Sequence, residues 1–129
     1  GRCADPTNFD ADYTYALGYN AAMLINSGVT GYMSSVRNLT DHTENWIPGG
    51  IPITMMMNME RRKGEMKPVI QKALVDLHGR PYLKFASMRE TIALNTLYQY
   101  PGPIQYFGPP EVCDRPSKTL LLEHDKEIY

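Results

Sequence analysis

Four basic residues concentrate positive charge in the middle of the chain, between two apolar segments. Arg61, Arg62 and Lys63 are consecutive, and Lys67 follows four positions after Lys63. Arginine and lysine bind phosphate oxygens through charge-assisted hydrogen bonds, so one interpretation is a phosphate-facing surface. The other interpretation is a solvated corner, which is the commoner role of a short basic run. No Walker-type glycine-rich loop is present, and the glycine pair at 49–50 is too short to count as one.

The acidic residues, histidines and cysteines do not predict a metal site or a disulfide. Asp10 and Asp12 could hold a magnesium ion, but two acids in the first turn of a helix usually interact with the helix dipole. The three histidines lack metal-ligand spacing, which argues against zinc. Secreted, disulfide-stabilised domains normally carry more cysteines than Cys3 and Cys113, so we expect reduced thiols. The residues alone therefore show no complete active site.

Four methionines lie close together, at positions 55, 56, 57 and 59. Their flexible thioethers could form an adaptable binding surface, or they could fill gaps in a core. Because four exposed methionines would make an unusual apolar patch on a protein surface, we expect the segment from Met55 to Met59 to be largely buried.

The first fifty residues predict a loop, a helix and a strand. Turn and capping residues at 5–8 precede a stripe of apolar residues at spacings of three and four, and Gly28 suits the left-handed helix end. Residues 29–36 are rich in β-branched and aromatic side chains and predict a strand, followed by a loop at 38–50. A helix that leads into a strand is half of a βαβ repeat, which indicates an α/β fold. The stripe consists of Tyr13, Ala16, Leu17, Ala21, Leu24 and Ile25.

The second half is less regular. Residues 68–77 fit either a helix or a strand, and we favour a strand that ends at a turn at 78–79. Prolines at 101 and 103 exclude a helix there. The other expected elements are a buried strand or short helix at 51–59, a helix from Pro81 to about Asn95 and a final strand at 119–123.

Length and composition bound the classes of protein that remain. The chain has 129 residues, 43% hydrophobic and 21% charged, so disorder is excluded and one domain or part of one is expected. A compact monomer of this size buries roughly two-thirds of its unfolded surface. The formal charge of −1 gives no general attraction to nucleic acid or to anionic membranes. No apolar run reaches the ~20 residues of a membrane helix, and the start resembles neither a signal peptide nor an initiator segment. We expect a cytoplasmic fragment or processed chain.

Several short sequence motifs, which occur in the same order as in a known family, add to these observations. Together they resemble the C-terminal portion of the long-chain pyrophosphate-dependent 6-phosphofructokinases over nearly the whole chain. The strings are Gly1-Arg2-Cys3, residues 5–10, Tyr15-Ala16-Leu17-Gly18, residues 27–33, residues 36–39, residues 49–62, residues 67–75 and residues 100–109. Each string is weak alone, and their order makes the match specific.

The resemblance implies a doubly wound, Rossmann-like α/β fold, with residues 1–129 as the second, sugar-phosphate-binding domain plus a C-terminal extension. It also implies reversible phosphoryl transfer from pyrophosphate to fructose 6-phosphate. In the family a Tyr-Glu-Gly-Arg loop holds the sugar phosphate, and Gly1 and Arg2 match its last two members. They are the substrate-binding residues that the resemblance assigns to this chain.

The resemblance places the catalytic aspartates and the Mg²⁺ site outside these residues. It therefore implies that the remainder of the same polypeptide is a partner of this segment, that the assembly is a homo-oligomer, and that the fragment alone is inactive. No catalytic or metal-ligating residue is expected in this chain. Two alternatives stay open: a non-catalytic regulatory subunit of the same family, and a stand-alone binding module.

Overall fold

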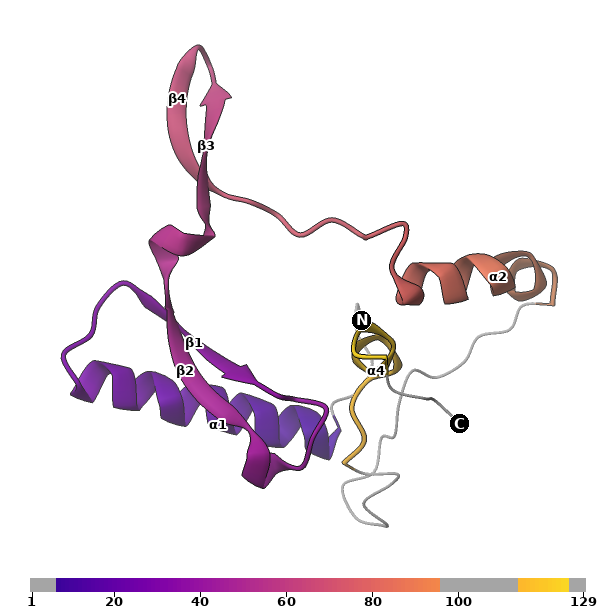
Figure 1. Ribbon diagram of the computed structural model, residues 1–129, viewed down its shortest axis with the longest axis horizontal. Helices are drawn as coiled ribbons and strands as arrows, with labels where there is room; N and C mark the ends of the chain where they lie inside the picture. Colours follow the sequence, from indigo (N-terminus) through magenta and orange to yellow (C-terminus); the bar gives the residue numbers. More distant parts are fainter. Residues whose placement is uncertain (1–6, 96–113, 126–129) are drawn as a thin grey trace.

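The computed structural model describes residues 7–95 and 114–125 and shows an extended arrangement of helices and hairpins (Figure 1). The first helix lies against one two-stranded sheet, a second hairpin extends away from it, and a long connection leads to two further helices. The elements are α1 (Asn8–Asn26), β1 (Tyr32–Arg37), β2 (Ile47–Pro52), β3 (Met57–Arg62), β4 (Glu65–Ile70), α2 (Arg80–Asn95) and α4 (Lys118–Glu123), with 3-10 turns at Thr43–Asn45 and Ile53–Met56.

Helix α1 begins at a capping box. The Oγ of Thr7 accepts the backbone N–H of Asp10 at 3.3 Å, and the Asp10 carboxylate accepts the N–H of Thr7 at 2.9 Å. This exchange satisfies two backbone donors that a helix start would leave without partners. The helix ends at Asn26, and Gly28 follows with a φ of +72°. The helix predicted from the apolar stripe is thus confirmed, except that Ile25 is 75% exposed.

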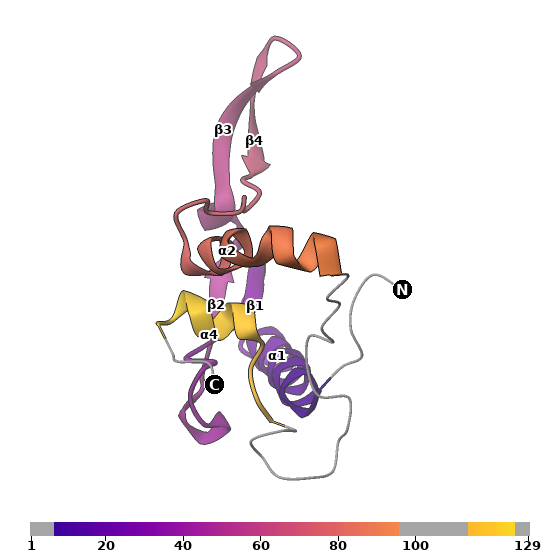
Figure 2. The ribbon, with the colours of Figure 1, turned by 90° about the vertical axis from the view of Figure 1, so that its right-hand side faces the viewer.

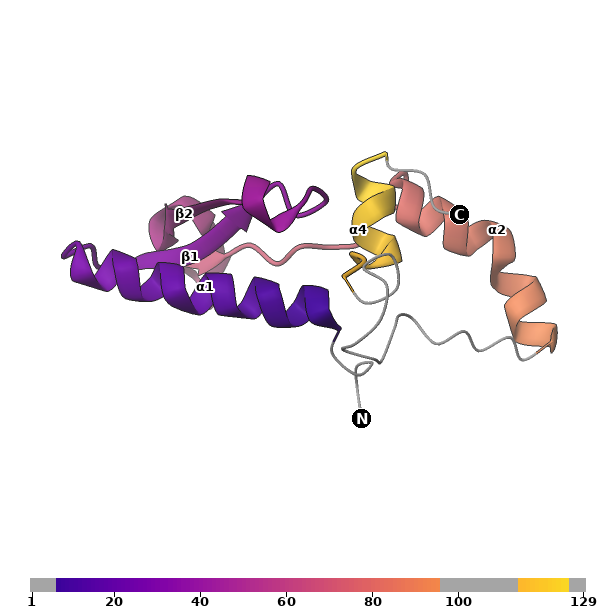
Figure 3. The ribbon, with the colours of Figure 1, turned by 90° about the horizontal axis from the view of Figure 1, so that it is seen from below.

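One side of α1 packs on the antiparallel pair β1–β2, and Figure 3 shows the helix and the sheet as two layers. The side-chain amide of Asn20 donates to the carbonyl oxygen of Gly49 at 2.6 Å and to Ser34 Oγ at 2.9 Å. The glycine that follows is needed for this approach. A Cβ on Gly50 would lie 3.0 Å from side-chain atoms of both Leu24 and Tyr32. Gly50 therefore allows α1 to pack closely on the sheet, whereas a Cβ on Gly49 would meet no atom within 4 Å.

A cluster of three aromatic rings joins the start of α1 to the loop between β1 and β2. The ring of Trp46 lies edge-on to Phe9 at 5.7 Å and to Tyr13 at 6.2 Å between centroids. The loop is held by Asp41, whose carboxylate accepts the N–H of His42 at 2.8 Å, and the indole N–H of Trp46 donates to the Asp41 carbonyl at 3.0 Å. The loop predicted at 38–50 is confirmed as far as Trp46, and strand β2 begins at the next residue.

The second hairpin, β3–β4, turns through Lys63 and Gly64. Both residues have positive φ, +52° and +85°, which defines a two-residue type I′ turn. The segment 51–59, for which the sequence left a buried strand or a short helix open, contains the end of β2, a 3-10 turn at Ile53–Met56 and the start of β3. Strand β4 ends at Ile70 and residues 71–76 have no regular structure, so the strand predicted at 68–77 is only partly correct.

The C-terminal described part consists of α2 and α4, which pack against each other (Figure 2). Helix α2 confirms the helix expected from Pro81 to Asn95. The strand predicted at 119–123 is wrong, because this segment is helix α4, capped by the Ser117 side chain, which accepts the N–H of Leu120. Leucine favours helices over strands, and the cap decides the outcome. The segment 100–103 lies outside the described residues.

The described residues do not close into a compact domain. The chain has an accessible surface of 10522 Å², against roughly 6,900 Å² for a compact monomer of 14.6 kDa. It buries about half of its unfolded surface, so the expectation of two-thirds is wrong. Among the described residues, the buried hydrophobic side chains are Phe9, Val36 and Leu121. The chain mixes helix and strand as expected, but its described strands pair only antiparallel.

None of the helices in residues 7–95 and 114–125 combines the length and the apolar character that crossing a bilayer requires.

Two glycines in different environments test the local architecture. Gly64 has a φ of +85°, where an L-residue is strained, so Gly64→Ala should lower the free energy of unfolding by about 1–2 kcal/mol. Gly18 lies within α1, where an added Cβ would meet no atom of another element within 4 Å, so Gly18→Ala should raise the free energy of unfolding by about 0.5–1 kcal/mol. Urea denaturation of both variants measures the two signs. Equal effects would contradict the assigned backbone geometry.

A second test concerns the stability of the Asp41 loop at low pH. The hydrogen bond from the His42 backbone and that from the Asn45 side chain hold the pKa of Asp41 below its ordinary value of 3.8. Because the pKa of Asp41 is lower in the folded state than in the unfolded state, its carboxylate stabilises the loop at any pH above the unfolded-state pKa. This contribution is lost as the pH falls through the folded-state pKa. Because Trp46 is the single tryptophan, its fluorescence should change as the pH falls below the ordinary Asp pKa of 3.8 and through the lower folded-state value. Asp41→Asn keeps an acceptor without a titrating proton, so the acid-induced change should shrink. An unchanged transition in this variant would exclude Asp41 as its cause.

Candidate functional site

The residues assigned by resemblance to the sugar phosphate, Gly1 and Arg2, lie outside the described residues, as do Cys3 and Cys113. In the sequence, Arg2 precedes Thr7, the cap of α1, by five positions. The described part of the chain therefore leaves the predicted substrate-binding pair untested, and it remains a prediction.

The basic run at 61–63 does not form a single phosphate site. Arg61 and Arg62 are neighbours on β3, and neighbouring strand residues point to opposite faces of a sheet. Arg62 already pairs with Glu60 at 3.1 Å, and Lys67 pairs with Glu65 at 3.4 Å. The hairpin thus places the four basic residues on two different faces and in the turn. Two of them, Arg62 and Lys67, are paired with carboxylates on the strands.

The methionines at 55–59 contradict the expectation of a buried segment. Met55 is 76% exposed, Met59 is 57% exposed and Met56 is 36% exposed, whereas Met57 is partly buried. The physical reason is that β3–β4 is a two-stranded sheet with no second layer over it among the described residues. The alternative interpretation, an adaptable binding surface, is the one that the geometry favours.

No metal site is found in the part of the chain that the structure describes. The expectation of two acids in the first turn of the helix is correct for Asp10, which also forms the capping box of α1, but Asp12 lies beyond that turn and is exposed. No three histidine, cysteine, aspartate or glutamate side chains within residues 7–95 and 114–125 gather in a way that could hold a metal ion. These residues therefore do not fit a magnesium site.

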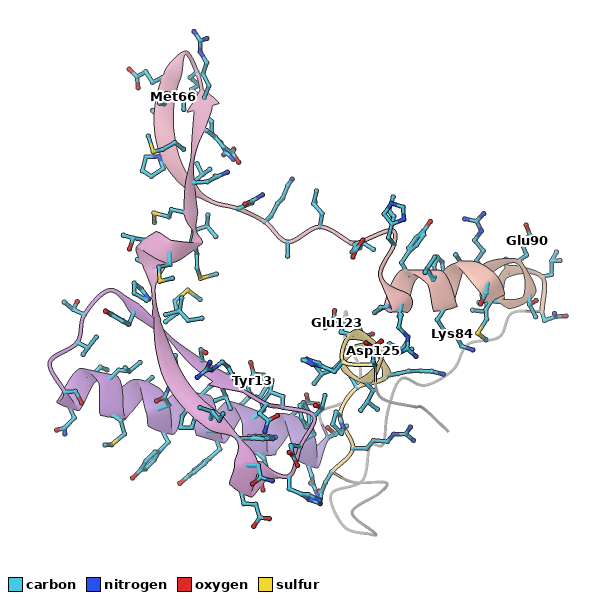
Figure 4. The ribbon with its side chains drawn as sticks, in the orientation of Figure 1. Tyr13, Met66, Lys84, Glu90, Glu123 and Asp125 are labelled. Atoms are coloured by element: carbon cyan, nitrogen blue, oxygen red, sulfur yellow. The ribbon has the colours of Figure 1, made fainter. Side chains whose placement is uncertain are left out.

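An open groove of about 1110 Å³ lies where the segment 73–79 meets α2 and α4. Arg80 at the start of α2 forms an ion pair with Asp125, just beyond the end of α4. Figure 4 labels Glu123 and Asp125 at α4, and Lys84 and Glu90 along α2. The groove combines apolar side chains with charged groups, and its lining includes Leu74, Leu77, Tyr82, Phe85 and Leu122 together with Asp76, His78 and Glu123.

The groove is open to a ligand, but its side chains do not form a catalytic arrangement. Among the described residues, no hydroxyl group in its lining is hydrogen-bonded to a histidine or carboxylate that could act as a base. Sequence reasoning missed this groove because α2 and α4 are separated in the chain by residues 96–117, and no local pattern indicates that they meet. The exposed ion pair that links them contributes little stability.

The chain is similar to proteins of one kind. It is 59% identical over 123 residues to the pyrophosphate–fructose 6-phosphate 1-phosphotransferase of Porphyromonas gingivalis, and 58% identical to that of Treponema pallidum. It is also 57% identical to subunit beta 1 of the Arabidopsis thaliana enzyme. These matches cover 95% of this chain, which spans only 21–22% of the relatives' own length.

No family model matches the chain. The matches to the curated relatives nevertheless cover 95% of the chain. A match to about a fifth of each relative agrees with the expectation that the chain corresponds to one portion of such a protein. The family resemblance is therefore confirmed: this chain is homologous to a segment of the pyrophosphate–fructose 6-phosphate 1-phosphotransferases, the pyrophosphate-dependent phosphofructokinases.

Proposed function

We propose that this chain is the C-terminal part of a pyrophosphate-dependent 6-phosphofructokinase, comprising its second, sugar-phosphate-binding domain and a C-terminal extension. The observation that carries the proposal is 59% identity over 95% of the chain to a protein named for this activity. The enzyme transfers a phosphoryl group from pyrophosphate to the 1-hydroxyl of fructose 6-phosphate. The products are fructose 1,6-bisphosphate and inorganic phosphate, and the reaction is reversible.

The contribution of this chain is to position the sugar phosphate. Phosphoryl transfer requires alignment of the reacting oxygens and neutralisation of charge more than covalent chemistry by the protein. The guanidinium of Arg2 can donate two parallel hydrogen bonds to phosphate oxygens, and Gly1 allows the backbone to pass close to the ligand. The family resemblance assigns Mg²⁺ and the proton-abstracting aspartate to residues outside this chain, and residues 7–95 and 114–125 contain no cluster of metal ligands.

The remainder of the same polypeptide is the first partner of this segment. Helix α1 covers one face of β1–β2, while Met33, Ile47 and Ile51 on the other face are 38–47% exposed. A doubly wound sheet has helices on both faces, so we propose that further strands and a second helical layer complete this sheet. The plant relatives are named as alpha and beta subunits, which supports an oligomer. We place the enzyme in the cytoplasm.

The first test separates the chain from the full-length protein. The 129-residue chain alone should not turn over fructose 6-phosphate, because the residues proposed to activate the sugar hydroxyl lie outside it. The protein expressed from the complete reading frame should do so in a coupled assay with pyrophosphate and magnesium. Turnover by the chain alone would show that the active site is misplaced. A full-length protein without turnover would instead support a non-catalytic subunit of the same family.

The second test addresses Arg2 in the full-length enzyme. A charged hydrogen bond to phosphate contributes about 1.5–3 kcal/mol, so Arg2→Ala should reduce kcat/KM for fructose 6-phosphate about ten- to a hundredfold. The affinity for pyrophosphate should stay near normal. Arg2→Lys should restore only part of the loss, because an ammonium lacks the two-pronged geometry.

Arg62→Ala is the matched control for this test, since Arg62 pairs with Glu60 on the hairpin and should leave the kinetics unchanged. Thermal stability is measured in parallel. If Arg2 only braces its loop, Arg2→Ala would lower the melting temperature and leave the substrate kinetics of the folded protein intact, and this result would remove Arg2 from the site.

A further inference from the structure

The β3–β4 hairpin has two faces of different chemistry. Its register pairs Met57 with Ile70, Met59 with Pro68 and Arg61 with Met66, and these six residues share one face. We call it the methionine face. The opposite face pairs Asn58 with Val69, Glu60 with Lys67 and Arg62 with Glu65. Opposite charges thus face each other on one side of the hairpin, and apolar side chains on the other.

The methionine face has no cover within the described residues. Met66 is 58% exposed and Ile70 is 48% exposed, and Met59 lies between the two. Figures 1 and 2 show the hairpin extending away from α1 and from α2, and Figure 4 shows Met66 on its outer part. An isolated two-stranded hairpin is only marginally stable in water, because one face must be buried to supply the hydrophobic energy. This hairpin therefore needs a partner surface.

Arg61 adds a charge requirement to that surface. It lies on the methionine face and forms no ion pair with another described residue, whereas Arg62 on the charged face pairs with Glu60. A guanidinium that loses water on docking needs an acceptor, preferably a carboxylate that can bind its fork. The complementary surface is thus apolar with an acidic residue near the tip of the hairpin.

We propose that the methionine face docks onto the remainder of the same phosphotransferase polypeptide, against an apolar surface that carries a carboxylate for Arg61. The inference rests on the proposed function, since the chain spans 22% of its relatives. Exposed apolar side chains outside the hairpin also favour this occupant. Met33 and Ile47 on β1–β2 and Leu74 in the segment 71–76 are uncovered among the described residues as well. A second copy seated on the methionine face would leave them exposed, whereas the remainder of the polypeptide can cover all of these surfaces.

The test uses the full-length protein and two neighbouring substitutions on opposite faces. Met59→Glu places a carboxylate on the methionine face and should lower the melting temperature by several degrees or abolish soluble expression. Asn58→Glu places the same group on the charged face and should leave the melting temperature within the error of the wild type. Similar effects of the two substitutions would overturn the proposal. Arg61→Ala should likewise destabilise the protein more than Arg62→Ala.

Methionine oxidation of the wild-type protein keeps the proposal testable where a variant fails to fold. In the folded full-length protein, hydrogen peroxide should oxidise Met59 and Met66 at least about tenfold more slowly than in the urea-unfolded protein, as mass spectrometry can quantify. Oxidation at the unfolded rate would overturn the proposal. Protection that disappears when the protein dissociates on dilution would assign the face to a second copy and overturn the occupant.

The same preparation is assayed for pyrophosphate-dependent phosphorylation of fructose 6-phosphate. Active protein with unprotected methionines would overturn the docking surface and leave the proposed function intact. Inactive protein with protected methionines would overturn the proposed activity and support docking. A complete reading frame that contains no further polypeptide would overturn both.

Discussion

The side-chain amide of Asn20 is the contact on which the arrangement of the first fifty residues depends. It donates to a carbonyl oxygen of β2 and to a hydroxyl of β1, and that hydroxyl, Ser34 Oγ, donates in turn to the carbonyl oxygen of Leu17 on α1 at 2.8 Å. Polar groups that are withdrawn from water must be paired, so this network sets the helix at one position on the sheet. Gly50 removes the side chain that would hinder the approach.

The aromatic cluster and the capping box extend this arrangement to the start of α1. Phe9 is 9% exposed and contacts Trp46, which the Asp41 loop holds in place. The cap at Thr7 defines where the helix begins, five positions after Arg2 in the sequence.

Several surfaces have no second layer over them among the described residues. The outer face of β1–β2, the methionine face of β3–β4 and the segment 71–76 all expose apolar side chains, including Leu74 at 78%. Most soluble monomers do not expose apolar patches of this extent. Together with a match to about a fifth of each relative, the exposure is consistent with a portion of a larger domain.

Local patterns in the sequence determined much of the secondary structure. The apolar stripe and the capping residues predicted α1, and Pro81 predicted the start of α2 to within one residue. The ordered strings also established the family resemblance. The candidate groove was not predictable, because it depends on the approach of two helices distant in the chain.

Burial and pairing were decided only by the tertiary structure. An apolar segment such as 55–59 is buried only where another layer covers it, and the residues themselves do not specify that layer. The same holds for the charges: adjacency in the sequence suggested one basic cluster, whereas the alternation of the strand separated Arg61 from Arg62. The two-residue turn at Lys63-Gly64 joins β3 and β4 as antiparallel neighbours. Lysine is not a usual residue of a type I′ turn, so the sequence did not predict this hairpin.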